Sequence, residues 1–219
     1  MAGMKAGERW SKDVAHYDVP HLRLRTVAHL INELKPKTLV DLGCAKGTLR
    51  SLIPSAQYTG CDFIAPRDEH DFRFFRCDFN RETTPDAIRN SEMVVASGLL
   101  EYIEDLPAFI SEIRDMLIGR GMFIATYFNA NHFSRRLRKI GGKKLHHHPD
   151  WTRIYPLDEL RQIISERGFQ INKIVPLNHS LSVARPVGET VNEEVQIDRF
   201  HLYSPLFAHQ FILVCEKTS

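Results

Sequence analysis

Seven short apolar runs recur along the chain, each of a length typical of a β-strand buried on both faces. They lie at residues 38–42, 58–62, 72–77, 93–97, 122–127, 171–176 and 210–215. Three longer stretches carry apolar residues every three or four positions, the pattern of amphipathic helices, at 21–34, 106–117 and 157–167. This alternation predicts an α/β fold with a doubly wound, mostly parallel sheet.

Local signals mark the start of one of these helices and the end of another. Asp105 precedes the second helix, where its side chain would accept a backbone N–H. Gly168 follows the third, where helices commonly end.

With 219 residues the chain can bury one substantial core, so we expect one domain over 1–219. Residues 1–35 would form its N-terminal helical cap, and 129–155 is too long for an ordinary connection and is expected to form a lid.

Composition excludes several classes of protein. With 43% apolar and 26% charged residues, the chain resembles ordinary soluble globular proteins rather than disordered ones. A formal charge of +2 provides no global field, so nucleic acid is an unlikely partner and any anion must be recognised locally. Residues 1–8 lack a signal core and no run approaches a membrane span, so we expect a cytoplasmic protein without a membrane partner. The cysteines have no metal or disulfide spacing and are predicted to be buried thiols: Cys44, Cys61, Cys77 and Cys215.

A glycine-bracketed turn follows the first predicted strand. Gly43 and Gly47 would allow a tight bend that leads into a helix at Thr48, with bare backbone N–H groups and room for a ligand. Asp41 adds a carboxylate beside this turn. Ligands of open α/β sheets bind beyond the carboxyl ends of the strands, so the residues that leave neighbouring strands are considered together.

Acidic residues follow the second and third predicted strands. Asp62 lies about twenty residues after the glycine turn, where a carboxylate can accept both ribose hydroxyls. Asp78 offers an acceptor for an exocyclic amine, and Phe79 offers an aromatic face for a purine. Together these residue types suit adenosine.

With these motifs in order, the sequence resembles the class I S-adenosylmethionine-dependent methyltransferases from about His16 to the C-terminus. The resemblance implies a Rossmann-like, seven-stranded sheet whose last strand is antiparallel, with S-adenosyl-L-methionine as cofactor. Segments 97–103 and 118–121 resemble the family's motif after strand four and its turn before strand five. Residues 128–135 and 151–157 faintly resemble MetW-like methyltransferases. The implied cofactor-binding residues are Asp41, Gly43, Cys44, Ala45, Gly47, Asp62, Phe63, Asp78, Phe79 and Ser97.

Ala45 departs from the family pattern, because many members carry a third glycine there. The turn 43–47 also lacks the spacing of the dinucleotide fingerprint, which disfavours a nucleotide oxidoreductase. Each residue has a plainer interpretation when taken alone. Asp62 or Asp78 would then be a surface turn residue, and Gly47 the entry to a helix.

Methyl transfer from a sulfonium needs an aligned nucleophile and exclusion of water, and a base only where the acceptor must lose a proton. Candidates by position are His16, Tyr17, Glu101, Tyr102, Tyr127 and His132. The place after the fourth strand lacks the Pro-Pro-aromatic motif of base-amine methyltransferases, and the chain has no Pro-Cys dipeptide for cytosine C5 chemistry. The acidic magnesium ligands of catechol-type enzymes are also missing, so we expect catalysis without a metal.

The expected lid is basic, because Arg135, Arg136, Arg138, Lys139, Lys143 and Lys144 occur before the first acid at Asp150. It would suit an anionic or carrier-bound acceptor, or it would be a solvated helix face. Consecutive histidines at 146–148 point apart in an extended chain, which favours an exposed loop over a metal site. Aromatic residues would line the acceptor pocket or pin the lid: Trp10, Tyr17, Trp151 and Tyr155.

Three functions are compatible with this sequence. The first is methyl transfer to an oxygen or nitrogen nucleophile of a small molecule. The second is a non-catalytic module that binds S-adenosylmethionine, and the third is an RNA or protein methyltransferase that uses the basic segment. The sequence does not predict the oligomeric state.

Overall fold

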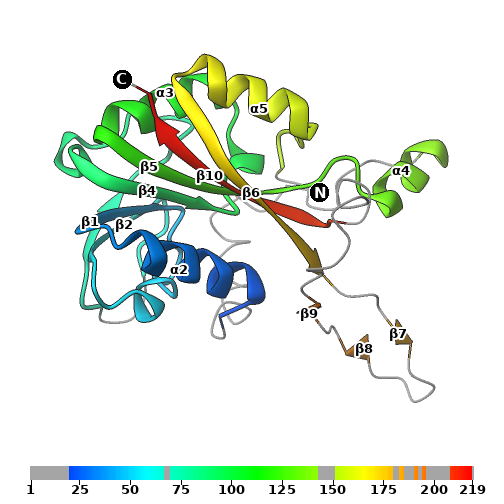
Figure 1. Ribbon diagram of the computed structural model, residues 1–219, viewed down its shortest axis with the longest axis horizontal. Coiled ribbons are helices and arrows are strands. Elements are labelled where there is room, and N and C mark those ends of the chain that lie inside the picture. The colour runs from blue at the N-terminus through cyan, green and yellow to red at the C-terminus, as the bar shows by residue number, and fades with distance from the viewer. Residues whose placement is uncertain are drawn as a thin grey trace, which may run out of the picture.

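A central mixed sheet organises the protein in a computed structural model that describes residues 20–66, 70–142, 151–179, 183–184, 190–191, 194–195 and 208–218. The strand order is β3-β2-β1-β4-β5-β10-β6, with β9 at the far edge. Neighbours from β3 to β5 pair in parallel, whereas β10 is antiparallel to both β5 and β6 (Figure 1). The predicted doubly wound α/β sheet with an antiparallel last strand is therefore confirmed.

The strands of this sheet are close to those predicted. Their bounds are β1 Thr38–Leu42, β2 Gln57–Asp62, β3 Arg73–Arg76, β4 Ser91–Ser97, β5 Leu117–Phe128, β6 Phe169–His179, β9 Glu194–Val195 and β10 Gln210–Lys217. A separate ladder joins β7 Val183–Ala184 to β8 Thr190–Val191. The register of β4 and β5 shifts between Leu117 and Met122, so the predicted turn at 118–121 is an irregularity inside β5.

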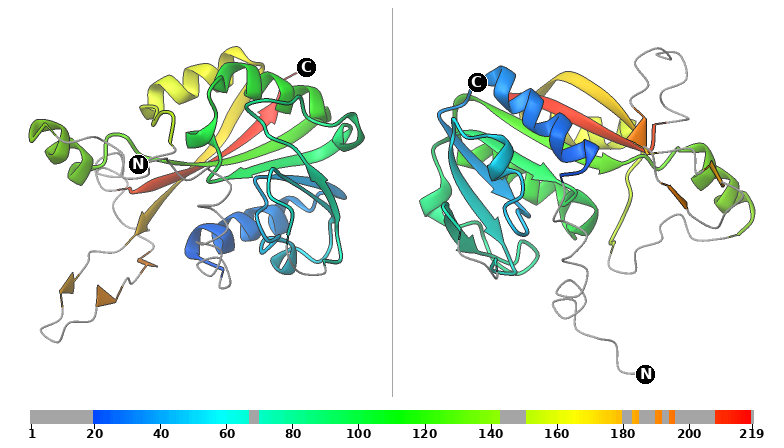
Figure 2. Two further views of the ribbon diagram at one scale, coloured as in Figure 1. Left: turned by 180° about the vertical axis from the view of Figure 1, so that it is seen from behind. Right: turned by 90° about the horizontal axis from the view of Figure 1, so that it is seen from below.

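Helices cover both faces of the sheet (Figures 1 and 2). One face packs against α2 (Leu22–Leu34), and the other packs against α3 (Leu106–Met116) and α5 (Leu157–Glu166). The predicted caps are confirmed: Asp105 Oδ1 accepts the Ala108 N–H at 3.0 Å, and Gly168 follows α5 with φ 79°. The four cysteines are buried free thiols, as predicted.

The connection from β1 to β2 differs from the sequence expectation. No α-helix starts at Thr48; turns lead instead into η2 (Arg50–Leu52), a single 3₁₀ turn. Ile53 ends this turn in a non-helical conformation and precedes Pro54, which disfavours helical backbone in the residue before it. Leu49 and Ile53 are buried on the α2 side of the sheet. Burial of these two side chains holds the connection against the core without a longer helix.

Within the part of the chain that the structure describes, no helix combines the length and the apolar character needed to cross a bilayer.

Candidate functional site

One backbone hydrogen bond joins the glycine turn to the end of β2, and another closes the turn on itself. Gly43 N–H donates to the Cys61 carbonyl at 2.8 Å, and Gly47 N–H donates to the Cys44 carbonyl at 2.8 Å. Gly43 and Gly47 have φ of 73° and 74°, and Ala45 has φ 49°. The turn therefore uses left-handed backbone at alternate positions, which glycine adopts freely and alanine adopts only with strain.

Side chains of the protein, as well as backbone geometry, explain the two glycines. A Cβ on Gly47 would lie 2.4 Å from the Phe72 ring, and a Cβ on Gly43 would lie 3.3 Å from Leu99. The sequence predicts that these glycines leave room for a ligand. In the structure, Phe72 and Leu99 lie where the Cβ atoms would point, so packing inside the protein also requires glycine at both positions.

Asp62 joins the tips of β1 and β2. Its Oδ2 accepts the Ala45 N–H at 2.9 Å, and its Oδ1 accepts the Ile64 N–H at 3.1 Å. Burial raises the pKa of Asp62, while the N–H groups of Ile64, Ala45 and Phe63 oppose that rise. A carboxylate offers about four lone-pair sites. Each oxygen of Asp62 therefore keeps acceptor capacity for a further partner such as a ribose hydroxyl.

Asp41 lies deeper, at 3% exposed, beneath the same turn. The Tyr58 hydroxyl donates to its Oδ2 at 2.5 Å. The pKa of Asp41 is raised to about 7, mainly by burial. The Tyr58 hydrogen bond and the charge of Arg23 lower this pKa, whereas the charge of Asp62 raises it. A cation that binds nearby would therefore stabilise the charged carboxylate.

The third carboxylate lies at the same edge of the sheet. Cys77 N–H donates to the Asp62 carbonyl at 3.0 Å, which places Asp78 beside the end of β2. Asp78 Oδ1 accepts the Asn80 N–H at 3.1 Å, and the Phe79 ring packs 5.5 Å from the Phe109 ring of α3. The three predicted carboxylates thus gather at one edge, although Phe79 also serves the core.

Arg23 of α2 contributes a cation that the sequence did not reveal. Its guanidinium contacts Gly98 just beyond β4, since a Cβ on Gly98 would lie 2.6 Å from its Nη1. It lowers the pKa of both Asp41 and Glu101. Arg23 Nε is buried and, within the described residues, lacks a hydrogen-bond partner, as does the Oγ of Ser97. Arg23 of α2 therefore offers a donor, and Ser97 at the tip of β4 offers a hydroxyl, to a ligand.

These tips of β1 to β4 form what we call the cofactor half of the edge. The acceptor half comprises the ends of β5 and β10, the 3₁₀ turn η4 (Leu100–Tyr102), and segments 129–142 and 151–155. The two names follow the cofactor and acceptor positions that were predicted from the sequence.

Glu101 connects three parts of the acceptor half. It is 2% exposed; its Oε1 accepts the Phe128 N–H at 2.6 Å, and its carbonyl accepts the Thr152 N–H at 2.8 Å. Its Oε2 has no hydrogen-bond partner in the described part of the chain. Burial raises the pKa of Glu101, and hydrogen bonds together with Arg23 and Arg135 oppose that rise. This geometry suits a structural brace.

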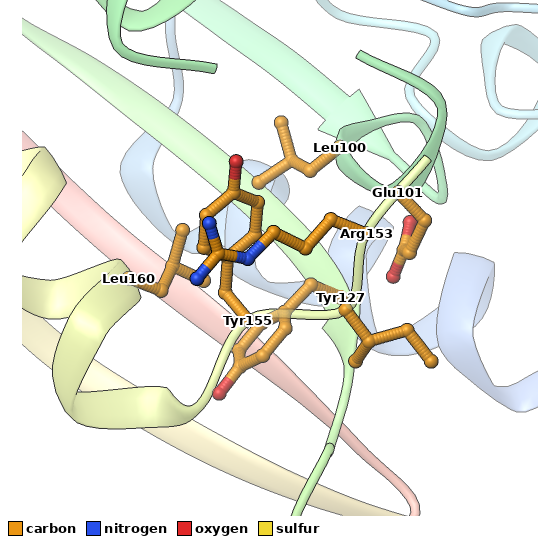
Figure 3. A pocket seen from close by; sticks show the side chains of 7 residues that line it. Leu100, Glu101, Tyr127, Arg153, Tyr155 and Leu160 are labelled. Atoms are coloured by element: carbon orange, nitrogen blue, oxygen red, sulfur yellow. The ribbon is translucent and has the colours of Figure 1, made fainter. Parts of the chain in front are cut away.

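Glu101 also lines a small pocket with about 180 Å³ of empty space, open solvent included. Figure 3 shows the side chains that surround it, which come from η4, β5, the segment before α5 and α5 itself. They include Leu100, Glu101, Tyr127, Arg153, Tyr155 and Leu160. Small-molecule sites usually enclose roughly 300–1,000 Å³. This pocket is therefore too small to hold a cofactor.

Aromatic and histidine rings gather at the ends of β5 and β10. The Phe128 ring lies 4.5 Å from Trp151 and 5.6 Å from His209, measured between centroids. His132 lies 5.0 Å from His209, and Tyr102 lies 6.4 Å from Trp151. We call these five side chains the aromatic cluster. Its residues come from four separate segments of the chain, and His209 was not predicted.

The catalytic candidates fall into three groups. His132 and Tyr102 belong to the aromatic cluster. Glu101 and Tyr127 are buried, and burial raises the pKa of Tyr127 well above its usual range. His16 and Tyr17 lie outside the described residues, as do Trp10, Lys143, Lys144 and the histidines at 146–148. Among the residues that are described, no group of three His, Cys, Asp or Glu is placed to hold a metal ion.

Solved structures share this fold. A methyltransferase from Haloferax volcanii, in complex with the Trm112 methyltransferase activator, matches with a TM-score of 0.65 and 17% identity over 97% of this chain and 96% of that one. A SAM-dependent methyltransferase from Archaeoglobus fulgidus gives 0.61 and 16%, over 89% and 94%. Magnesium protoporphyrin IX methyltransferase from Synechocystis, with bound SAH, gives 0.57 and 15%, over 100% and 90%.

No curated protein has a sequence that matches this chain. The sequence profile described as "Methyltransferase domain" matches residues 15–174, which is most of the chain and includes every strand tip of the cofactor half. The protein therefore belongs to the methyltransferase-domain family and is a class I S-adenosylmethionine-dependent methyltransferase.

Proposed function

We propose that this enzyme transfers the methyl group to an oxygen or nitrogen nucleophile of a small molecule that binds against the aromatic cluster. The observation that carries the proposal is the position of this cluster. It borders η4, which follows the tip of β4 directly, on the same edge as the three carboxylates. Aromatic walls beside a polar cofactor site suit a compact organic acceptor.

The cofactor half would hold S-adenosylmethionine through its carboxylates and through Arg23. Asp62 would accept the ribose hydroxyls, since each of its oxygens keeps acceptor capacity beyond its bond to a backbone N–H. Asp78 and Phe79 would bind the adenine, as the family resemblance implies. Arg23 offers a donor, and Asp41 a carboxylate, to the ends of the methionine part.

When bound, S-adenosylmethionine supplies a methyl group that its sulfonium already activates. The remaining work is alignment and water exclusion. The rings of Phe128 and Trp151 would exclude water on the acceptor side. His132 is the described candidate best placed to take a proton from a hydroxyl or ammonium, because it is partly exposed and belongs to the aromatic cluster. Glu101 would act as a brace, and His16 and Tyr17 stay candidates from the sequence.

Transfer of a labelled methyl group tests the acceptor class. The full chain and methyl-labelled S-adenosylmethionine would be incubated in three parallel reactions. One contains a small-metabolite extract, one contains total RNA and one contains total protein. Label in the metabolite extract supports the proposal. Label only in RNA or protein would overturn it. Binding of S-adenosylhomocysteine without transfer to any fraction would indicate the non-catalytic module instead.

Substitution of His132 tests the base. We expect His132→Gln to lower kcat by about 100-fold or more and to flatten the acid limb of the pH–rate profile. The matched control is His29→Gln on the exposed surface of α2, which should leave kcat unchanged. Both variants should bind S-adenosylhomocysteine as wild type does. A His132→Gln enzyme with wild-type kcat at every pH would exclude His132 as the base.

A further inference from the structure

The orientation of α4 (Phe133–Ile140) is fixed by a buried arginine. Arg135 is 3% exposed; its Nη1 donates to the Asn129 carbonyl at 2.7 Å and to the His209 carbonyl at 3.3 Å. Its guanidinium also lies 5.1 Å from the centre of the Phe128 ring. The face of α4 that carries Arg135 is therefore turned towards the body of the protein.

The apolar residues of α4 face the other way. Phe133, Leu137 and Ile140 are 51%, 52% and 84% exposed. Their spacing of four and three residues places them on one helical face. Figures 1 and 2 show α4 standing away from the sheet and from α3 and α5. A helix on a globular surface normally buries its apolar face, so α4 is inverted and its apolar face points outward.

The charged residues of α4 are all cationic. Arg136 and Lys139 are exposed on the same helix. The sequence from 129 to 149 contains six lysines and arginines and no aspartate or glutamate. Two copies of this face would bring like charges together, which disfavours self-association. An anionic partner is favoured by charge complementarity.

We propose that α4 docks on an anionic lipid surface, with Phe133, Leu137 and Ile140 entering the headgroup–acyl boundary while Arg136 and Lys139 contact lipid phosphates and carboxylates. A largely polar helix with a well-defined apolar face and flanking basic residues is typical of helices that lie in the membrane interface. Such a helix needs no spanning segment. The sequence-based expectation of no membrane partner rested on the absence of such a span and on the balanced net charge.

Vesicle flotation of the full chain tests this docking. We expect binding to vesicles of about three parts phosphatidylcholine to one part phosphatidylserine, and at least about tenfold weaker binding to phosphatidylcholine alone. Ile140→Ser, and separately Arg136→Gln with Lys139→Gln, should each weaken binding to the anionic vesicles by about tenfold. The matched control is Ile118→Ser in β5, an exposed isoleucine at 41%, which should bind as wild type does.

Binding of S-adenosylhomocysteine by every variant would establish that each is folded. Absence of binding to the anionic vesicles, or binding that none of the α4 variants weakens, would overturn the proposal. Retention by polyglutamate without vesicle binding would assign the face to an acidic protein and overturn it too. A dimer that Ile140→Ser abolishes, again without vesicle binding, would assign it to a second copy of the chain, with the same consequence.

Discussion

The cofactor half and the acceptor half occupy one edge of the sheet but are built by different interactions. In the cofactor half, carboxylates accept backbone N–H groups from nearby turns, as Asp62 does from Ala45 and Ile64. In the acceptor half, distant segments meet: Asn129 bonds to Ala208, and Arg135 bonds to His209. Short motifs therefore encode the first region, whereas the assembled fold creates the second. The two should therefore respond separately to mutation.

Gly47→Ala should have the largest effect on stability, because it distorts the glycine turn of the cofactor half. The new Cβ would lie 2.4 Å from the Phe72 ring, at a residue whose φ is 74°. We expect the free energy of unfolding to fall by about 2–4 kcal/mol in denaturant titration. Adding Phe72→Leu should restore part of this loss. Gly142→Ala is the matched control, since its φ is also positive and nothing lies within 4 Å; an equal loss there would remove the packing argument.

Asp62→Ala should weaken binding of S-adenosylhomocysteine by about 1–3 kcal/mol, because two charge-assisted hydrogen bonds would lose their acceptor. Calorimetry provides the measurement. Asp71→Ala, at a side chain that is 73% exposed, is the control and should bind normally. Unchanged affinity in Asp62→Ala would contradict the assignment of the ribose site.

Asp41 should make the cofactor half sensitive to pH. Its pKa is raised from 3.8 to about 7 by burial, and the ammonium group of S-adenosylhomocysteine would favour the charged form. Affinity should therefore be full above pH 7 and should fall as the pH drops through 7, by up to about tenfold per unit. Asp41→Asn should remove this dependence. An affinity that is flat from pH 8 to about 5.5 would contradict the assignment.

The stability of the free protein should change in the opposite sense. A carboxyl with a raised pKa binds a proton more tightly in the folded state than in the unfolded state. Its contribution is therefore fully present below about pH 4 and is lost as the pH rises through about 7. The difference in unfolding free energy between wild type and Asp41→Asn, followed against pH, isolates this contribution.

Asn129→Ala tests whether the acceptor half can be destabilised without a change in cofactor binding. The side chain is buried; its Nδ2 donates to the Ala208 carbonyl at 2.7 Å, and its Oδ1 accepts the Asn131 N–H at 2.9 Å. We expect a loss of about 1–2 kcal/mol in stability and faster hydrogen exchange near β10. Affinity for S-adenosylhomocysteine should stay within about twofold. A larger drop would show that the two halves are coupled.

Ala45→Gly should have the smallest effect, and it should be favourable. Ala45 adopts φ 49°, a left-handed conformation that costs alanine about 1–2 kcal/mol and glycine almost nothing. The greater freedom of glycine in the unfolded chain offsets part of that gain. We expect a net increase of about 0.5–1 kcal/mol in the free energy of unfolding. A decrease would mean that the methyl group of Ala45 makes a contact worth more than the strain.

The sequence predicted most of the sheet, because buried strands are short apolar runs and each had a distinct signal. It also placed Asp41, Asp62 and Asp78 at one edge, since parallel strands carry their carboxyl ends to the same side. The helix expected at Thr48 was wrong. Spacing alone did not show that Pro54 and the buried Leu49 and Ile53 would restrict this connection to a 3₁₀ turn.

The remaining site residues had no local signal. In the sequence, Arg23 has the pattern of an ordinary polar residue of an amphipathic helix. Its position beside Gly98 depends on how α2 packs on the sheet. His209 precedes β10 and meets His132 only because β10 pairs with β5. The inverted face of α4 follows from the buried Arg135, whose partners are fixed by tertiary structure. Such long-range contacts are not encoded in any short window.

Glu101 closes the segment between Phe128 and Thr152 into a loop. Its carboxylate binds the Phe128 N–H, and its carbonyl binds the Thr152 N–H, so both ends of the segment between them are fastened to a single residue. The entropy of closing a loop grows only slowly with its length. Changes in the length of this segment that spare His132 and the buried Arg135 should therefore cost little stability and leave the supporting sheet in place.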